Sequence, residues 1–373
     1  LFFFYFTKNK FINNLSVKFT SRLFNKYIFK NYEFHTTKKT SVLIRNLISE
    51  VKLLCSTFIS PVFVLLIESI MLFGVLIFLL IYDSDITLFL GIGFFLVMII
   101  YFLAIKNKFS NWGKLRQELS KKSLKLSLDT LIGIKDIMIY HKENFYRKRF
   151  TTNEHESARV ATLYGTFQQL PRLMFEFIIV FFLVSLVFYL KIEGSTNEEI
   201  LEIVAVYGVA SIRFIPGASR IIGSLQQLKF GLPALNVILD ENILHNKYYD
   251  NLVEERAKNI SYKFKNSINF KNINFSYENK KEEIIFENLN LTINKKEIIG
   301  IVGPSGSGKS TFADLLSGLL IPSSGSIFLD DKNITNNLYA LSAIFAYVPQ
   351  AVYLFNDSIK NNIVLGEDAD EER

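Results

Sequence analysis

Residues 303–310 read GPSGSGKS, that is Gly303, Pro304, Ser305, Gly306, Ser307, Gly308, Lys309 and Ser310. The apolar run EIIGIVG (297–303) precedes this stretch, and a helix-prone segment (309–320) follows it. A short apolar run is typical of a buried parallel strand, so the order predicts a strand, a glycine-rich loop and a helix. Such an order marks the beginning of an α/β domain.

The loop fits the pattern GxxxxGK[ST], which binds the phosphates of a nucleotide. Glycines leave the backbone N–H groups free to wrap a phosphate, and the following helix directs its positive end to the same place. We expect Lys309 to reach the β- and γ-phosphates, Ser310 to coordinate Mg²⁺ and Thr311 to lie near the α-phosphate. We therefore predict that residues 303–311 bind a nucleotide with Mg²⁺; the other interpretation is a glycine-rich turn of a soluble α/β domain.

Further strands are predicted on both sides of the loop. Apolar and polar residues alternate at 268–277 and 284–293, which is typical of half-buried strands. The run SIFLDD (326–331) ends in two aspartates, as a strand that supplies a magnesium ligand would. It follows Lys309 by only about twenty residues and comes after a turn, so we assign it to a β-hairpin and do not expect Asp330 or Asp331 to bind Mg²⁺.

Four apolar runs are long enough to cross a membrane as helices, namely 58–82, 86–105, 173–190 and about 200–220. The first carries one charge, Glu68, and the third carries Glu176. The fourth is the weakest because it contains Glu202, Arg213 and Arg220. The short acidic connection between the first two runs predicts a helical hairpin.

The charges of the chain are unevenly placed. There are 42 Lys and Arg against 35 Asp and Glu, a net charge of +7. The basic residues lie beside the apolar runs, so we assign them to membrane topology and expect no nucleic acid partner. The segment 106–160 holds 13 basic and 6 acidic residues, which places it and the C-terminal part in the cytoplasm. The single cysteine, Cys55, excludes a disulfide framework within the chain.

The segment 106–160 is polar, periodic and helix-prone, with Gly133 as an interruption. As helices it would extend tens of ångströms beyond the membrane. It is either a solvated helical hairpin or a lever that contacts another cytoplasmic domain.

With these motifs in place, the chain resembles the ABC transporters, specifically exporter-type half-transporters with the ATPase fused behind the membrane domain. Tyr277, the last residue of FSY, lies 26 residues before Gly303 and is similar to the A-loop aromatic that stacks on adenine. Residues 346–350 resemble the strand that leads to the Q-loop, which implies that Gln350 contacts Mg²⁺ and the attacking water. The resemblance thus implies an ATP hydrolase coupled to transport, with Lys309 and Gln350 as its catalytic residues.

The resemblance predicts a helical transmembrane bundle with long intracellular helices, followed by a partial α/β P-loop domain. It divides the chain into a membrane domain (1–240), a linker (241–265) and the N-terminal part of a nucleotide-binding domain (266–373). Residues 27–45 and 131–150 are similar to the two coupling helices, which in this family dock on the ATPase. The family has six spans per half, so we expect two spans to be missing or truncated at the start.

The chain ends 23 residues after Gln350 with no LSGGQ-like signature, no Walker B strand followed by Glu and no switch histidine. We expect this stretch alone to bind nucleotide weakly and to hydrolyse it poorly. The function that we assign is therefore that of the complete protein, a homodimer or a paired half-transporter.

Three arginines are candidates for substrate binding. Arg213 and Arg220 are seven residues apart and share a helix face, and Arg172 lies at the mouth of the third apolar run. Arginine at membrane depth normally faces a cavity or a partner, and guanidinium groups suit phosphate or pyrophosphate. Alternatively, Arg220 is interfacial and Arg213 pairs with Glu202 or Glu176.

Residues 205–237 and 44–51 resemble bacterial lipid-linked oligosaccharide flippases. This resemblance implies an amphipathic, lipid-linked oligosaccharide as substrate, moved across the bacterial inner membrane by a multi-pass protein with a cytoplasmic nucleotide-binding domain. The alternatives are an ABC exporter of peptides, drugs or lipids, an ATP-binding membrane regulator without turnover, and a membrane-anchored P-loop kinase.

Overall fold

The computed structural model describes residues 2–241, 263–280, 282–335, 337, 339–342, 344–350 and 352–365. The chain forms two compact units, one of residues 1–30 with 38–251 and one of residues 31–37 with 252–373. Most of the predicted linker, 242–262, lies outside the described residues.

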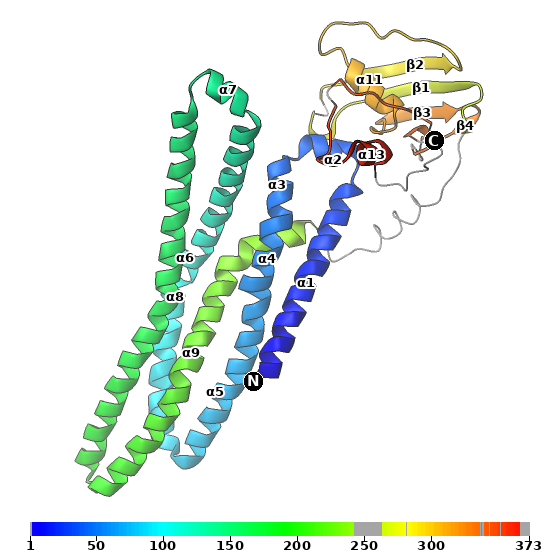
Figure 1. Ribbon diagram of the computed structural model, residues 1–373. Helices are drawn as coiled ribbons and strands as arrows, with labels where there is room; N and C mark the ends of the chain where they lie inside the picture. Colours follow the sequence, from blue (N-terminus) through cyan, green and yellow to red (C-terminus); the bar gives the residue numbers. More distant parts are fainter. Residues whose placement is uncertain are drawn as a thin grey trace. The chain divides into compact units, whose positions relative to one another are not determined.

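The first unit is helical (Figure 1). Its α-helices are α1 (Phe2–Ile28), α3 (Thr40–Arg45), α4 (Val51–Leu54), α5 (Ser60–Tyr82), α6 (Ser84–Ile132), α7 (Ile134–Ile139), α8 (Glu143–Glu193) and α9 (Asn197–Asp240). Two π-turns of five residues each, η1 (Asn46–Glu50) and η2 (Cys55–Ile59), join α3, α4 and α5 into one long helix. The helix α1 was not predicted from the sequence.

Four described helices are long and apolar enough to cross a membrane, namely Thr40–Tyr82, Ser84–Ile132, Glu143–Glu193 and Asn197–Asp240. Each contains one of the four predicted apolar runs, so the bundle is confirmed. With 49 and 51 residues, α6 and α8 are each about 75 Å long, far more than the roughly 30 Å of a hydrocarbon core. Their polar halves form the predicted hairpin, with α7 at its turn after Gly133 (Figure 1).

The long helix α9 packs against α5, α6 and α8, and glycines allow its closest contacts. A Cβ on Gly113 of α6 would lie 2.3 Å from the carbonyl oxygen of Phe230 in α9. A Cβ on Gly231 would lie 2.4 Å from the Thr57 hydroxyl. These backbones can approach each other only because both positions lack a side chain.

The turns at the end of the bundle opposite α7 are capped by side chains. Asp83 ends α5 and accepts a hydrogen bond from the Ile86 amide at 3.0 Å, which begins α6. Thr196 and Glu199 form a reciprocal capping box at the start of α9. Both caps satisfy orphan N–H groups that would otherwise be costly at a helix end.

The second unit contains a four-stranded antiparallel sheet. Its elements are α2 (Tyr32–Thr37), β1 (Ser267–Phe275), η3 (Glu278–Lys280), β2 (Phe286–Asn294), α11 (Lys309–Leu316), β3 (Ser324–Leu329), β4 (Lys332–Asn333), α12 (Tyr339–Ser342) and α13 (Ile359–Val364). The strand order is β2-β1-β3-β4. The predicted strands at 268–277 and 284–293 are confirmed, and so is the hairpin at 326–331, in which Phe328 pairs with Asn333.

A bulge in β1 decides which residues form the core of this unit. Asn272 has a φ of +52° and interrupts the pairing of β1 with both neighbouring strands. The extra residue shifts the alternation, so that Ile268 and Phe270 before it and Ile273 and Phe275 after it are all buried. Leu315 of α11 packs against Phe275 and covers this face.

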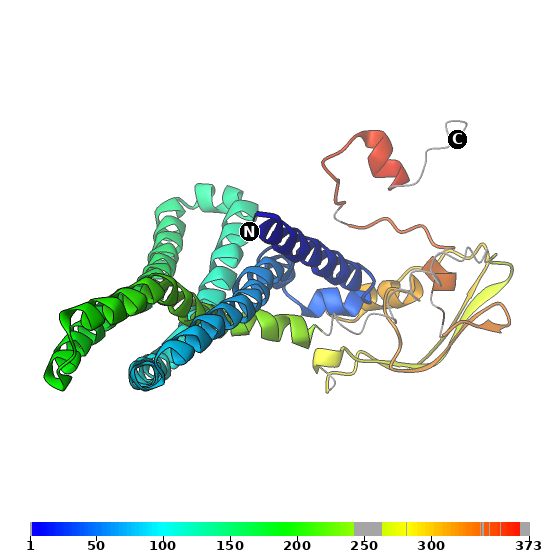
Figure 2. The ribbon, with the colours of Figure 1, turned by 90° about the horizontal axis from the view of Figure 1, so that it is seen from below.

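The prediction of a buried parallel strand at 297–303 is wrong for this structure. The segment has no regular secondary structure, and Ile298 and Val302 are 99% and 95% exposed. A parallel strand needs a neighbour that satisfies its N–H and C=O groups, and no described strand pairs with this one. Residues 346–349 are also without a strand, and the segment after them leads to α13, which lies away from the sheet (Figure 2).

Candidate functional site

The glycine-rich loop adopts a backbone that its glycines make accessible. Gly306 and Gly308 have φ values of +85° and +87°, which L side chains rarely adopt. A Cβ on Gly303 would lie 2.6 Å from the Ser307 hydroxyl oxygen, and one on Gly308 would lie 2.9 Å from Ile285. The loop therefore depends on glycine at these three positions, as the sequence pattern requires.

Lys309 lies across the loop at the start of α11. Its Nζ donates hydrogen bonds to the carbonyl oxygens of Gly303 and Pro304, both at 2.7 Å. Gly308 precedes the helix without a side-chain cap, and the first amide bonded within α11 is that of Phe312. The open N–H groups and the ammonium group give this helix end a positive potential suited to an anion.

Tyr277 is brought to the same helix. Its hydroxyl lies 3.3 Å from the Thr311 hydroxyl, and its half-buried ring packs edge-on against Phe275 at 5.1 Å. An aromatic ring thus stands two residues beyond the end of β1 and close to the first turn of α11. The resemblance of Tyr277 to the A-loop aromatic had implied this neighbourhood.

The two other predicted ligands, Ser310 and Gln350, are not held at the loop by any described contact. Ser310 is exposed, with no hydrogen bond of its hydroxyl among the described contacts. Gln350 is exposed too, and no contact in the described part of the chain joins it to the loop. Nearby, burial raises the pKa of Asp314 in α11.

Asp330 has a structural role. Its carboxylate accepts hydrogen bonds from the backbone amides of Lys265, Asn266 and Ser267 at 3.2, 2.7 and 3.0 Å. These bonds, that of Asn266 first, lower the pKa of Asp330. The carboxylate thus holds the start of β1.

The predicted substrate arginines are paired with carboxylates in the first unit. Arg220 donates two hydrogen bonds to the buried Glu68, at 2.8 and 3.0 Å, and Arg213 lies 3.8 Å from the same carboxylate. Arg172 pairs instead with Glu176 at 2.9 Å on the exposed surface of α8. Arg213 and Arg220 therefore form one cluster, to which Arg172 does not belong.

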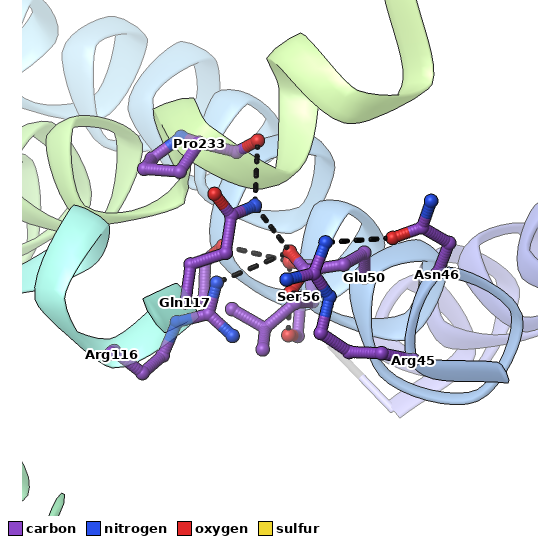
Figure 3. Close-up of polar contacts among 9 residues, drawn as sticks. Arg45, Asn46, Glu50, Ser56, Arg116, Gln117 and Pro233 are labelled. Carbon is purple, nitrogen blue, oxygen red and sulfur yellow. Dashed lines mark hydrogen bonds and ion pairs between the residues drawn. The ribbon is translucent and has the colours of Figure 1, made fainter. Parts of the chain in front are cut away.

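A buried polar network was missed from the sequence (Figure 3). Glu50, which has no exposed surface, lies 3.2 Å from Arg116 and 3.6 Å from Arg45. Gln117 bridges Glu50 and the carbonyl oxygen of Pro233 at 3.3 and 3.2 Å. The network joins α3, η1, α6 and α9.

The same network continues to the end of α9. Arg45 donates to Asn46, and Asn46 donates to the Tyr27 hydroxyl at 3.1 Å. That hydroxyl donates to Glu241, which also pairs with Lys26 at 3.1 Å. Burial raises the pKa of Tyr27, so the hydroxyl keeps its proton. Polar residues spread over four helices carry no local motif, which is why their partners could not be predicted.

A second contact missed from the sequence involves α2. The Glu33 carboxylate accepts a hydrogen bond from the Glu278 amide at 2.5 Å within the second unit. Glu278 directly follows Tyr277, so this short helix touches the segment that carries the aromatic ring. The likeness of residues 27–45 to a coupling helix implies docking on the ATPase part, but it did not indicate this residue pair.

Family models identify both parts of the chain. The model described as "ABC transporter transmembrane region" matches residues 1–207, and the model described as "ABC transporter" matches residues 286–373. The chain belongs to the ABC transporter family. The ABC assignment covers the helical bundle as well as the phosphate loop, and it agrees with the exporter resemblance of the sequence.

Relatives of this ABC transporter chain include an export ATP-binding/permease protein of Rickettsia bellii, 37% identical over 153 residues. That alignment covers 40% of this chain and 25% of the relative. The ATP-dependent permease MDL1 of Candida albicans is 45% identical over 107 residues, 28% of this chain and 16% of the permease. The chain thus spans only a minor part of the length of these relatives.

A bacterial Atm1-family ABC exporter, solved with ATP bound, has the same fold. The superposition has a TM-score of 0.70 and 19% sequence identity, and it covers 98% of this chain and 62% of that one. At this identity the match establishes the fold, which is that of an ABC exporter.

Proposed function

We propose that this chain is part of an ATP-driven exporter that moves an amphipathic anion, such as a lipid-linked oligosaccharide, across the bacterial inner membrane. The observation that carries the proposal is the 3.3 Å contact between Tyr277 and Thr311. It puts an aromatic ring suited to adenine beside a helix start suited to phosphates. The same chain carries four helices able to cross a membrane.

The loop fits a nucleotide. The backbone amides of residues 306–311 and the ammonium group of Lys309 would hold the phosphates, after Lys309 exchanges its two carbonyl partners for phosphate oxygens. Ser310, whose hydroxyl is exposed, would coordinate Mg²⁺, and Gln350 would have to approach the loop to act on the ion and the attacking water. Hydrolysis of the bound ATP supplies the free energy of transport.

The contact of Glu33 with Glu278 supports a route from the nucleotide to the membrane helices. α2 follows α1 and precedes α3, the beginning of the first span. A shift of the Tyr277 segment on nucleotide binding would pull on α2 through this hydrogen bond. We infer alternating access in a homodimer or a paired half-transporter, in which closure of two nucleotide domains turns the cavity outward.

The proposed substrate class is supported by the excess of positive charge around Glu68. Two guanidinium groups share one carboxylate, which leaves one net positive charge at membrane depth. A positive charge held there is suited to a phosphate or pyrophosphate head group. The resemblance of residues 205–237 to lipid-linked oligosaccharide flippases favours a glycan lipid.

The test uses the full-length protein in proteoliposomes with a fluorescent lipid-linked oligosaccharide. We expect ATP-dependent flipping by the unmodified protein and none by the Lys309→Ala variant, which should still insert into the membrane. Export of peptides or drugs without flipping of the lipid would contradict the proposed substrate class. ATP binding without turnover of any cargo would favour a regulator.

A further inference from the structure

The bundle contains a groove between α5 and α9 that no functional role yet accounts for. It measures about 710 Å³ and is lined by Met71, Gly74, Val75 and Phe78 of α5 and by Ala205, Val206, Val209, Ala210 and Arg213 of α9. Eight of its nine lining residues are uncharged, and the ninth is an arginine. An apolar groove with one cation matches a molecule that has an apolar chain and one anionic group.

The guanidinium group of Arg213 is available to bind an anion. Its only described contact with a carboxylate is the 3.8 Å ion pair with Glu68, and its side chain is 43% exposed. Arg220, by contrast, holds Glu68 with two hydrogen bonds at 2.8 and 3.0 Å. Glu68 is thus largely neutralised by Arg220, so the net positive charge of the cluster resides mainly on Arg213.

A glycine places this cluster beside the groove. A Cβ on Gly217 of α9 would lie 2.7 Å from Leu72 and 3.3 Å from the Glu68 carboxylate. The two helices therefore approach each other closely here, next to Glu68, and leave the guanidinium of Arg213 at the edge of the groove. The close contact fixes the carboxylate that orients both arginines.

The charged end and the apolar end of the groove follow each other along the helices in the same order as the head group and chains of a membrane lipid. Arg213 and Met71 are the lining residues farthest along each helix from the α5–α6 turn, whereas Ala205 and Phe78 are nearest to it. The apolar wall extends about 12 Å from Arg213 toward that turn, at 1.5 Å per residue. A lipid in the leaflet on the α7 side has its head group toward α7 and its chains toward the turn.

The geometry points to a binding site for an anionic lipid, with its phosphate on Arg213 and an acyl chain in the groove. Arg220 is a positioning residue that holds Glu68 and does not contact the lipid. This inference rests on the proposed exporter function and narrows its substrate site to one arginine. Arg172, paired with Glu176 on the surface of α8, is not part of it.

The test is photolabelling of the full-length protein in nanodiscs. The probe is phosphatidic acid with a diazirine near the end of one acyl chain, and the control probe is phosphatidylcholine with the same chain. We expect phosphatidic acid to label Phe78, Val206 and Val209 in preference to phosphatidylcholine. Arg213→Gln should weaken that labelling about tenfold, as expected for the loss of one charge-assisted hydrogen bond.

A steric variant tests the groove itself. Gly74→Leu fills it, and a Cβ at Gly74 has no atom within 4 Å, so the helix should tolerate the change. Gly208→Leu is the matched control, since Gly208 has equally open space and does not line the groove. Labelling should fall in Gly74→Leu and persist in Gly208→Leu.

Equal labelling by both probes in the unmodified protein would overturn the site, and so would labelling that withstands both Arg213→Gln and Gly74→Leu. Azido-ATP labelling of the Tyr277 segment confirms that the nucleotide-binding unit of each variant is folded. The site and the exporter proposal fail separately. Lipid labelling without ATP-dependent flipping would contradict the exporter, whereas flipping that survives Arg213→Gln would contradict the site.

Discussion

Arg116 Nη2 lies 3.2 Å from the Glu50 carboxylate, although Glu50 has no exposed surface. The pair joins α6 to η1, and Arg45 approaches the same carboxylate from the preceding helix at 3.6 Å. A buried carboxylate between two guanidinium groups is tolerated because their charges compensate its loss of hydration. Removal of that carboxylate leaves two positive charges without compensation inside the bundle.

We therefore predict that Glu50→Gln lowers the free energy of unfolding by about 3–5 kcal/mol, the usual cost of one broken buried ion pair. The control is Arg172→Ala, which removes an exposed pair with Glu176 and should cost at most about 1 kcal/mol. Thermal unfolding in detergent measures both. Similar shifts for the two variants would show that the Glu50 network does not hold the helices together.

Gly113→Ala should be strongly destabilising. Its Cβ would meet the Phe230 carbonyl oxygen at 2.3 Å, and a backbone atom cannot move aside as a flexible side chain could. Gly165→Ala in α8 is the matched control, since a Cβ there has no atom within 4 Å and should stabilise the helix by about 0.5–1 kcal/mol. Relative to the unmodified protein, the unfolding midpoint should fall in Gly113→Ala and rise in Gly165→Ala. Equal shifts in the two variants would contradict the close packing of α6 on α9.

Asp330 should make the second unit sensitive to acid. Its pKa is lower in the folded chain than the ordinary value because three backbone amides bond to the carboxylate, so the folded state favours the ionised form. The resulting stabilisation is complete above the ordinary pKa of 3.8 and is lost as the pH falls through the lowered value.

Asp330→Asn tests this account, because asparagine tolerates the φ of +54° at this position. We expect a lower unfolding midpoint than that of the unmodified protein at neutral pH, and a difference that disappears in strong acid. Asp331→Asn is the neighbouring control and should have little effect at either pH. A difference between Asp330→Asn and the unmodified protein that does not change with pH would contradict the assigned role.

Glu33→Ala should uncouple the nucleotide from transport. It removes the acceptor for the Glu278 amide without touching the phosphate loop. Transport in proteoliposomes should fall severalfold while azido-ATP labelling stays near the unmodified level. Glu33→Gln keeps an acceptor oxygen and should retain most of the transport. If Glu33→Ala transports normally, this hydrogen bond is not part of the coupling.

Local patterns predicted much of this molecule. The apolar runs located all four spans, and the glycine spacing located a loop whose φ values require glycine at Gly306 and Gly308. The hairpin interpretation of residues 326–331 was confirmed because a short run after a turn has only its neighbour with which to pair.

Features that depend on distant partners were not predictable. The segment 297–303 is as apolar as a buried strand, yet Ile298 is 99% exposed because composition does not supply a pairing neighbour. Glu50 and Arg116 lie 66 residues apart in sequence, so neither residue signals the other. Arg213 was expected to pair with Glu202 or Glu176 if it did not bind substrate, and it lies instead beside Glu68 on another helix.

The most direct test of the central claim is azido-ATP photolabelling of the full-length protein, unmodified and with Lys309→Ala. Lys309 bridges two carbonyl oxygens of the loop, and its ammonium group would be the main positive charge at the phosphates. The account predicts labelling on the Tyr277 segment that competes with unlabelled ATP and is lost in Lys309→Ala. Labelling that is absent from the unmodified protein, or that persists unchanged in the variant, would contradict it.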